Sequence, residues 1–558
     1  MSGKFLCGAV IGILAALSAC GGKEGSFQGK IDRTKWLYHA EDRVYYQLGI
    51  PYVSRPVSDK HQKLAVFVPE AYMSCRANGD GTHTCSVNKN GNVAGYTATS
   101  APVVFPVETP GYMDNPALTE YQSFKEYADA GMVYVYAGCR GRSQGAPAGV
   151  TDLKAAIRYI RRNADVLPID SERFFVAGMS GGGAQSAILG ASGNSALYEP
   201  YLKQIGAVQN VRDAVAGVMA WCPVTNLDSG NEAYEWQMGM TRSGLSEQQR
   251  KNSDQMAEAF AGYINAVGLK GPDGRGLTLQ ASADGIYQAG SYYDFLKGVV
   301  ENSLNDFLND TAFPYDADKA GRDGAAPAFL NKPKDVSFEE KDNIKRQTAQ
   351  GDVVLSGVYA DKESYLADLN AKKVWVVFNE DTKRYEITSL ADFAKAMKPA
   401  TKGIGAFDDL NKAQGENTLF GYGDGQGAHF DGIMAGLLEK TEYAAAFQSD
   451  LSRRDFVGNP VSVRLDMYTP LYYLLPAYQG YKTASVAPYW RIRTGISQSD
   501  TALTTEVNLA QALENYFGTA AKVDFKTVWG LKHVKAETTG NSTQNFIDWV
   551  NAVLKADQ

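Results

Sequence analysis

The sequence predicts an α/β protein whose mostly parallel, doubly wound sheet is interrupted by one large insertion. Short β-rich runs alternate with helical patterns up to about residue 225, and such alternation is typical of a parallel sheet with helices on both faces. The alternation stops near residue 226 and resumes near residue 464. The intervening segment, roughly 230 residues long, has a size consistent with a domain of its own.

Each element follows from a local pattern. The first strands are predicted at residues 63–68, 102–107, 132–137, 174–177 and 215–221. The clearest helix places Leu153, Ala156, Ile157 and Ile160 on one face, with Thr151 or Asp152 as its start signal. A hairpin is predicted at 374–388, further strands at 486–493 and 523–528, and a last helix at 545–554. The predicted organisation is a first core part at 36–225, an inserted domain at 226–463 and a second core part at 464–558.

The N-terminus predicts an export signal that is not part of the fold. Lys4 precedes an apolar run over residues 5–17, which is too short to span a bilayer. The run ends in Leu-Ser-Ala-Cys at Cys20, which resembles the lipobox of bacterial lipoproteins. This resemblance implies removal of residues 1–19 and lipid attachment at Cys20, with residues 20–35 as a tether. An ordinary secretory signal that happens to contain a cysteine is the alternative. We therefore expect a lipid-anchored protein of the bacterial cell envelope, on its periplasmic or extracellular side.

The composition excludes several classes of function. The 558 residues carry a formal net charge of −7 without a basic block, which argues against nucleic acid as the main partner. An aromatic fraction of 11% argues against disorder. After the signal, no run reaches about 18 uninterrupted apolar residues, so no spanning helix is predicted. The sequence contains no His-x-x-x-His or Cys-x-x-Cys spacing, so neither a metal nor an organic cofactor is expected.

The remaining cysteines divide into two pairs with different expected roles. Export would place the mature chain in an oxidising compartment, where disulfides persist. Cys75 and Cys85 flank a Gly/Asn/Thr-rich stretch and predict a local disulfide. Cys139 and Cys222 each end an apolar run and are expected to be small buried core residues.

A candidate nucleophile lies in the pattern Gly-x-Ser-x-Gly at residues 178–182. The bare pattern is weak, but a strand-like run at 174–177 precedes it and a helix-like run at 184–189 follows it. A strand, a tight turn and a helix are what a nucleophile elbow requires. The helix N-terminus directs free N–H groups toward developing negative charge. Ser180 is therefore the predicted nucleophile, and a glycine turn without chemistry is the alternative.

A serine nucleophile needs a base, and the chain has five histidines. His533 follows the last predicted strand, where the serine–acid–histidine order of α/β-hydrolases places its base. His429 in the insertion is the competitor, although a surface or substrate-contacting role is expected there. Asp500 follows the strand at 486–493 and would orient the imidazole and stabilise the imidazolium. Its alternative role is to cap a helix that starts near Thr501.

The oxyanion hole needs two backbone N–H groups that face the tetrahedral oxygen. Gly181, directly after the nucleophile, is the first candidate. The second is expected in the turn after the strand at 102–107. Gly111 is favoured there because Pro110 has no N–H to donate.

These residues resemble the α/β-hydrolase superfamily and, more narrowly, bacterial tannases and related feruloyl-esterase-like lipoproteins. The matching segments are 178–186, 233–236, 406–408, 416–417, 419–421, 490–493 and 500–501. The resemblance implies an α/β-hydrolase fold with the insertion as its lid domain, and an esterase that acts on galloyl or other phenolic esters. It also implies that Lys402 and Glu416 contact the phenolic hydroxyls. A solvated lysine and glutamate on a lid loop are the alternative.

One position departs from the family pattern. The acid region of the family carries two aspartates one residue apart, whereas this chain has Gln498 at the first position and Asp500 at the second. Either Asp500 serves as the acid of the triad, or the triad lacks its acid. The departure bears on tannase specificity more than on ester hydrolysis.

The sequence as a whole predicts a secreted, lipid-anchored serine carboxylesterase. His533 would accept the Ser180 proton as the serine attacks an ester carbonyl, and water would then clear the acyl-enzyme. The expected partners are a small-molecule ester and, through the N-terminal lipid, a membrane. A serine peptidase on the same fold and a catalytically inactive surface-binding lipoprotein are the alternatives.

Overall fold

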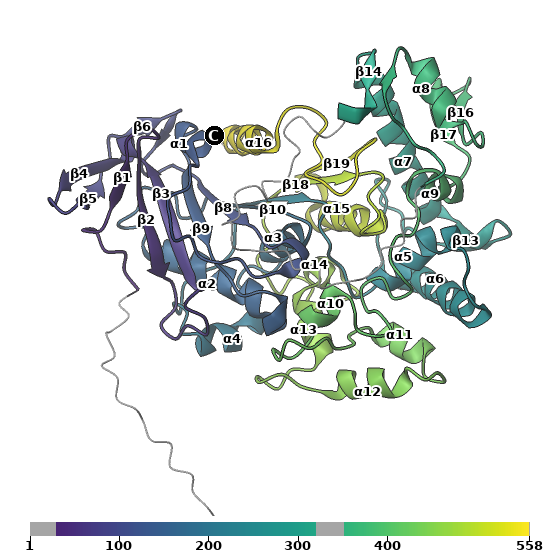
Figure 1. The fold of residues 1–558 in the computed structure, drawn as a ribbon, viewed down its shortest axis with the longest axis horizontal. Helices are drawn as coiled ribbons and strands as arrows, with labels where there is room; N and C mark the ends of the chain where they lie inside the picture. Colours follow the sequence, from purple (N-terminus) through teal and green to yellow (C-terminus); the bar gives the residue numbers. More distant parts are fainter. Residues whose placement is uncertain (1–28, 320–350, 557–558) are drawn as a thin grey trace, which may run out of the picture.

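The computed structural model describes residues 29–319 and 351–556. Among these residues, nine strands form one central sheet (Figure 1). In spatial order they are β1 (Leu37–His39), β2 (Val44–Pro51), β3 (Lys63–Pro69), β9 (Val133–Ala137), β8 (Val103–Val107), β10 (Phe174–Met179), β11 (Gly217–Trp221), β18 (Tyr489–Gly495) and β19 (Lys522–Val528). From β9 to β19 neighbouring strands are parallel, whereas β1, β2, β3 and β9 pair antiparallel. The predicted α/β fold with a mostly parallel sheet is confirmed.

Helices cover both faces of the sheet, which explains why its central strands are apolar throughout. The helices that flank it are α1 (Lys125–Asp129), α2 (Ala148–Arg162), α3 (Gly181–Ala191), α4 (Glu199–Gln204), α15 (Thr504–Phe517) and α16 (Ser542–Ala556). Adjacent residues of a strand point to opposite faces. Phe174 of β10 lies under the guanidinium of Arg161 of α2, whereas Phe175 meets the ring of Trp549 of α16. Thus α2 and α16 pack on opposite faces.

The start of α2 differs from the prediction. The helix begins at Ala148, so Thr151 and Asp152 lie inside it and neither is its start signal. Asp152 is buried, and its carboxylate accepts hydrogen bonds from the backbone N–H, Nε and Nη2 of Arg140 and from Nε2 of Gln62. Aspartate is a preferred helix cap, but the carboxylate oxygens of Asp152 instead accept hydrogen bonds from Arg140, which follows β9.

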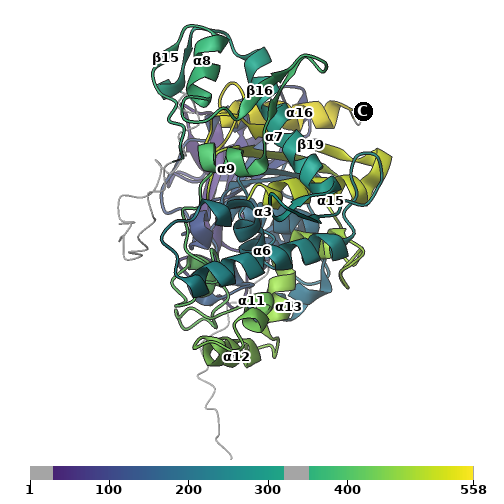
Figure 2. The same cartoon turned by 90° about the vertical axis from the view of Figure 1, so that its right-hand side faces the viewer.

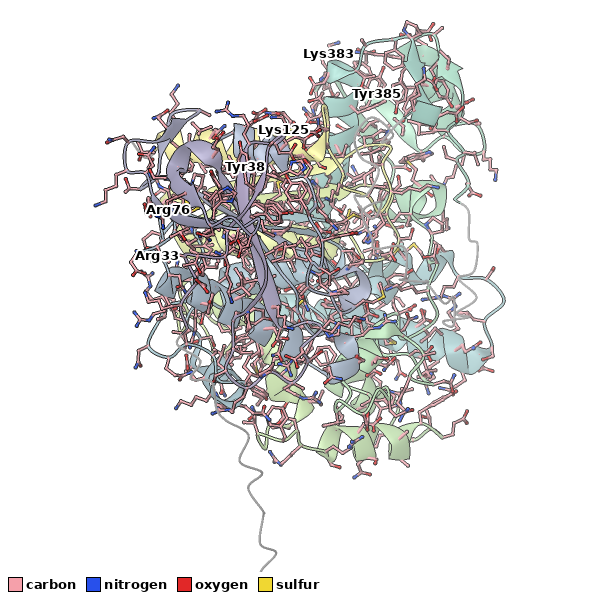
Figure 3. All side chains as sticks on the ribbon, turned by 60° about the vertical axis from the view of Figure 1, so that its left-hand side comes forward. Arg33, Tyr38, Arg76, Lys125, Lys383 and Tyr385 are labelled. Atoms are coloured by element: carbon pink, nitrogen blue, oxygen red, sulfur yellow. A yellow bond between two sulfur atoms is a disulfide. The ribbon has the colours of Figure 1, made fainter. Side chains whose placement is uncertain are left out.

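The N-terminal part adds small hairpins beside the sheet. They consist of β4 (Met73–Ala77) with β5 (His83–Val87) and β6 (Asn92–Val93) with β7 (Tyr96–Thr97). A disulfide joins Cys75 on β4 to Cys85 on β5, and Cys139 and Cys222 are both buried. Figure 3 shows Arg33, Tyr38 and Arg76 at this end of the molecule.

The packed chain begins earlier than expected. Ile31, which was placed in the predicted tether, is buried, and its N–H donates to Oδ1 of Asn163 at 2.9 Å. Residues 29–35 are therefore attached to the core rather than extended from it. The predicted signal peptide and Cys20 lie outside the described residues.

Between β11 and β18 the chain leaves the sheet and builds a separate layer of helices. These are α5 (Gly230–Met238), α6 (Glu247–Val267), α7 (Ser291–Asp310), α8 (Lys362–Leu369), α9 (Leu390–Met397), α10 (Gly415–Leu419), α11 (Gly432–Leu437), α12 (Ala444–Ser452), α13 (Val461–Met467) and α14 (Pro470–Leu474). Figure 2 shows α6 across this layer, with α8 above it and α11 to α13 below. Helix α7 packs against β19, the last strand of the central sheet. That residues 226–463 form a domain of their own stays a prediction.

Short antiparallel pairs complete this layer. They are β12 (Gln280–Ser282) with β13 (Gly285–Ala289), β14 (Tyr315–Asp316) with β15 (Val358–Tyr359), and β16 (Val376–Asn379) with β17 (Arg384–Ile387). The last pair is the hairpin predicted at 374–388, and Lys383 and Tyr385 mark it in Figure 3. Within the described ranges, no helix is long and apolar enough to cross a membrane.

Candidate active site

Ser180 occupies a sharp turn between the end of β10 and the start of α3. Its backbone has φ 59° and ψ −123°, a conformation that is strained for a residue with a Cβ. The turn is held from both sides, because the Ser180 N–H donates to the carbonyl of Trp221 at 2.9 Å and its own carbonyl accepts from Ala184 at 2.8 Å. A strained serine between a buried strand and a helix N-terminus has the geometry of a nucleophile elbow.

The two predicted oxyanion residues lie side by side. The 3₁₀ turn η2 (Pro110–Tyr112) passes so close to Gly181 that a Cβ there would lie 2.4 Å from the Tyr112 nitrogen and 3.0 Å from the Gly111 nitrogen. The Tyr112 N–H already donates to the Thr109 carbonyl at 3.0 Å. Gly111 has φ 57°, a left-handed conformation that glycine adopts without strain. The Gly111 nitrogen therefore lies close to Gly181, the residue that directly follows Ser180.

The predicted base and acid meet at the same edge of the sheet. Asp500 follows β18 and His533 follows its parallel neighbour β19, and Oδ2 of Asp500 lies 3.6 Å from Nδ1 of His533. The Cys222 thiol, directly after β11, donates to the Val534 carbonyl at 3.2 Å and ties the histidine loop to the strand next to β10. Helix α15 begins only at Thr504, with Leu503 preceding it, so Asp500 does not cap that helix.

Gln498 makes its side-chain hydrogen bonds to α15 and within its own loop. Its side chain is buried, its Nε2 donates to Oε1 of Glu506 at 3.0 Å, and its Oε1 accepts the Asp500 N–H at 3.0 Å. The amide is thus engaged with α15 and with the backbone of its own loop. Asp500 is the carboxylate that lies beside His533.

The loop that carries Lys402 is fixed directly onto the loop that carries Asp500. The hydroxyl of Tyr234 donates to the Ser499 carbonyl at 3.1 Å and accepts the Lys402 N–H at 3.1 Å. Arg242 donates to the Lys402 carbonyl at 2.6 Å and forms a buried ion pair with Glu235. The Lys402 ammonium lies 4.1 Å from the centroid of the Phe407 ring. Sequence reasoning did not find the roles of Tyr234 and Arg242, because their partners lie far along the chain.

Glu416 lies on the helix that packs against η2, the turn that carries Gly111. It is buried in the first turn of α10, and α10 packs against η2. Burial, reinforced by the Glu416 carboxylate, raises the pKa of Tyr112. Arg142, which the sequence analysis did not single out, donates to the Gly111 carbonyl at 3.2 Å and packs against Gly415. It thereby links the oxyanion turn to the helix that carries Glu416.

Comparison with known proteins finds a family model over part of the chain and similar solved structures over nearly all of it. The BD-FAE family model matches residues 94–266, which include Ser180. Tannin acyl hydrolase from Lactobacillus plantarum is 26% identical, with a TM-score of 0.62 over 91% of this chain and 94% of that chain. A structure of tannin acyl hydrolase in complex with ethyl gallate is 25% identical, with a TM-score of 0.65 over 91% and 94%. The Fusobacterium nucleatum tannase, at 24% identity, has a TM-score of 0.69 over 95% of this chain and 100% of that chain. No curated protein matched the sequence.

The chain is an ester hydrolase with the α/β-hydrolase fold. The resemblance to bacterial tannases and feruloyl-esterase-like enzymes is confirmed by these likenesses.

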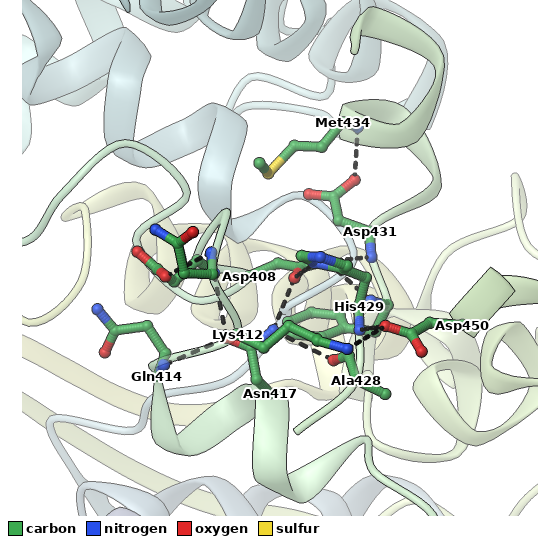
Figure 4. A network of polar contacts seen from close by, with 12 residues as sticks. Asp408, Lys412, Gln414, Asn417, Ala428, His429, Asp431, Met434 and Asp450 are labelled. Carbon is green, nitrogen blue, oxygen red and sulfur yellow. Dashed lines mark hydrogen bonds and ion pairs between the residues drawn. The ribbon is translucent and has the colours of Figure 1, made fainter. Parts of the chain in front are cut away.

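A buried polar network in the insertion joins Asp408 to Asn417, His429 and Asp431 (Figure 4). Asp408 accepts hydrogen bonds from Nδ2 of Asn417 and the backbone N–H groups of Phe430 and Asp431, and Nδ1 of His429 lies 2.7 Å from it. Because Asn417 follows Glu416 in α10, the network fixes the position of that helix.

His429 is a buried structural residue of the insertion. Its ring is fully buried, and it stacks on Phe447 with centroids 3.7 Å apart. The expectation of a surface or substrate-contacting histidine at this position was wrong. Its Nδ1 faces Asp408 within the lid rather than the serine, which leaves His533 as the histidine at the edge where Ser180 lies.

A second serine–histidine–aspartate set lies outside the esterase site. Ser58 Oγ is 2.7 Å from Nδ1 of His61, and Nε2 of His61 is 2.7 Å from Oδ2 of Asp114. Ser58 lies in a turn before β3 and has no strand–helix elbow behind it, so the set lacks the geometry of a nucleophile. Its role is to tie the β2–β3 loop to the segment that follows η2. Over residues 29–319 and 351–556, no group of three or more metal-ligating side chains is arranged to hold a metal ion.

Proposed function

We propose that this esterase is a serine carboxylesterase for galloyl or other phenolic acyl esters, with Ser180, His533 and Asp500 as its triad. The observation that carries the proposal is the meeting of three features at one edge of the sheet. These are the strained Ser180 elbow, the Asp500–His533 pair, and the adjacent backbones of Gly111 and Gly181.

The mechanism follows from these positions. His533 takes the Ser180 proton as the hydroxyl oxygen attacks the ester carbonyl carbon, and Asp500 stabilises the imidazolium that results. The N–H groups of Gly111 and Gly181 stabilise the oxyanion, each donor contributing about 2.7–4 kcal/mol. His533 then protonates the leaving alcohol. A water molecule attacks the acyl-enzyme and transfers a proton to His533, and His533 then protonates the departing Ser180 oxygen, which releases the acid and the free serine.

Two side chains of the insertion, those of Lys402 and Glu416, suit a substrate with a phenolic acyl group. A buried carboxylate at Glu416 would accept hydrogen bonds from phenolic O–H groups, and the Lys402 ammonium would donate to a phenolic oxygen. Lys402 lies on the loop that is bonded through Tyr234 to the Asp500 loop, and Glu416 lies on the helix that packs against the Gly111 turn, so both would contact a ring attached to the carbonyl. Structures similar to this chain include tannin acyl hydrolase in complex with ethyl gallate and with 3,4-dihydroxybenzoate.

The test of this function compares three esters: methyl gallate, methyl ferulate and p-nitrophenyl acetate. We expect hydrolysis of methyl gallate with the highest kcat/KM, and loss of all three activities in Ser180→Ala. Activity on peptides in place of esters would favour a peptidase. Failure of a fluorophosphonate to label Ser180 would contradict the catalytic proposal altogether.

We further propose that the esterase is exported and anchored by lipid on Cys20 in a bacterial cell envelope. The support is the apolar run at residues 5–17 and the Leu-Ser-Ala-Cys segment. A bacterial host fed radioactive palmitate should label the wild-type protein and leave Cys20→Ala unlabelled. Equal labelling of both proteins would contradict the anchor.

A further inference from the structure

A buried lysine of the lid reaches the loop that carries the triad acid. Lys398 directly follows α9 and is fully buried. Its ammonium donates to the backbone carbonyl of Gln498, two residues before Asp500. The contact spans 100 residues of sequence and crosses from the insertion to the core.

The side chain of Gln498 connects this contact to the backbone of Asp500. Its side-chain oxygen accepts the N–H of Asp500 at 3.0 Å and that of Thr501 at 3.2 Å. Its side-chain nitrogen donates to Glu506 at 3.0 Å. An amide both accepts and donates in this way, whereas a carboxylate could only accept. The backbone on both sides of Asp500 is thus held by one side chain, whose own backbone carbonyl is held by Lys398.

Glu506 balances the charge of the lysine. Both groups are fully buried, on α15 and after α9 respectively. Burial raises the pKa of Glu506 and lowers the pKa of Lys398, and each group's charge opposes the shift of the other. The Glu506 carboxylate also accepts from the hydroxyls of Thr501 at 3.0 Å and Thr494 at 3.3 Å. A buried lysine costs stability unless it is paired, so packing alone would favour an apolar side chain here.

A second set of contacts binds the same two segments. The Thr401 hydroxyl donates to the Ser499 carbonyl at 3.4 Å, and Tyr234 bridges Ser499 to the N–H groups of Thr401 and Lys402. The lid segment 398–402 and the acid loop 498–501 are therefore one hydrogen-bonded unit. This unit contains the predicted triad acid and the predicted substrate lysine.

We propose that Lys398 is a positioning residue that holds Asp500 beside His533 through Gln498, so that alignment of the triad depends on docking of the lid. The inference rests on the proposed triad. It assigns a role to Gln498 as well, since the amide at this position connects the lid to the acid loop.

The test uses the whole chain, two variants at the contact and one control variant. Lys398→Met removes the ammonium with little change in length. The double variant Lys398→Met/Glu506→Gln also removes the charge left unpaired, so it should fold when the single variant does not. Lys395→Met is the matched control, because Lys395 is an exposed lysine one turn earlier in α9. The readouts are the pKa of His533 by NMR titration and the separate values of kcat and KM.

We expect the folded double variant to lose about 100-fold in kcat, the size of effect that a misplaced catalytic group produces, with KM for p-nitrophenyl acetate within about twofold. The pKa of His533 should fall, because a carboxylate beside an imidazolium favours its charged form. Lys395→Met should match the wild type in both. An unchanged His533 pKa and an unchanged kcat in the folded double variant would overturn the role of Lys398. A wild-type protein without Ser180-dependent hydrolysis would overturn the proposed function instead, and the His533 titration would still decide the role of Lys398.

Discussion

Asp500 lies 3.6 Å from the His533 ring, a separation slightly beyond a direct hydrogen bond. Such distances are common in free enzymes and shorten in the complex with substrate. Asp500→Asn should therefore lower kcat by about 10²- to 10⁴-fold with a smaller change in KM. Steady-state kinetics on p-nitrophenyl acetate measures this. The exposed Asp548→Asn serves as the control, and equal kcat for Asp500→Asn and wild type would rule out Asp500 as the triad acid.

Gln498 has a neutral side chain for an electrostatic reason. Its amide nitrogen lies 3.0 Å from Glu506, so an aspartate there would bring a second buried carboxylate toward Glu506 and lose the donor. We expect Gln498→Asp to lower the free energy of unfolding by about 1–3 kcal/mol. Denaturant unfolding at pH 7 checks this. Adding Glu506→Gln should recover most of the loss, and a double variant as unstable as the single one would contradict the explanation.

At the scale of elements, α2 is fixed to the end of β9 by a buried ion pair. Asp152 accepts from three nitrogens of Arg140 and from Gln62, so its loss leaves a buried guanidinium unpaired. Asp152→Ala should cost about 3–5 kcal/mol of stability. Asp165→Ala, which breaks the exposed pair with Lys30, should cost less than about 1 kcal/mol. Urea unfolding measures both losses. Equal losses of unfolding free energy in the two variants would show that burial does not strengthen the contribution of an ion pair to stability.

At the scale of the whole molecule, buried carboxyl groups make stability depend on pH. Burial raises the pKa of Asp228 to about 6, and burial together with the charge of Asp431 raises that of Glu232. These groups hold protons in the folded chain that the unfolded chain releases near pH 4, so their contribution to stability is lost as pH rises from about 4 through 6. A carboxylate whose pKa is lowered in the folded chain, such as Asp213, has the opposite effect. Its contribution to stability is lost as pH falls.

The free energy of unfolding should therefore decline as pH rises from about 4 through 6. Glu232 faces Asp431 across α5 and α11, and Glu232→Gln keeps its shape without the charge. This variant should decline less with pH and exceed the wild type in stability at pH 8. Thermal or urea unfolding from pH 4 to 8 checks both curves, and parallel curves for the two proteins would contradict the assignment.

The local patterns of the sequence determined the framework of the site. The buried strand, the glycine turn and the helix around Ser180 follow from short-range periodicity and from the space that glycine leaves. The order of Ser180, Asp500 and His533, each after a parallel strand of the sheet, follows from the chain order of the fold. Each of these features is carried by a short segment, a strand with the turn or loop that follows it, so the amino-acid sequence displays them directly.

Only the tertiary structure decided how the site is held. The burial of His429, the packing of Ile31 and the use of Asp152 as an ion-pair partner rather than a cap could not be predicted. Neither could the contact of Lys398 with Gln498, across 100 residues, nor that of Arg242 with Lys402, across 160 residues. Side chains that meet across such separations have no common period in the sequence. Their pairing is set by which segments the folded sheet and lid bring together, and this is why Asp500, and not Gln498, lies beside His533.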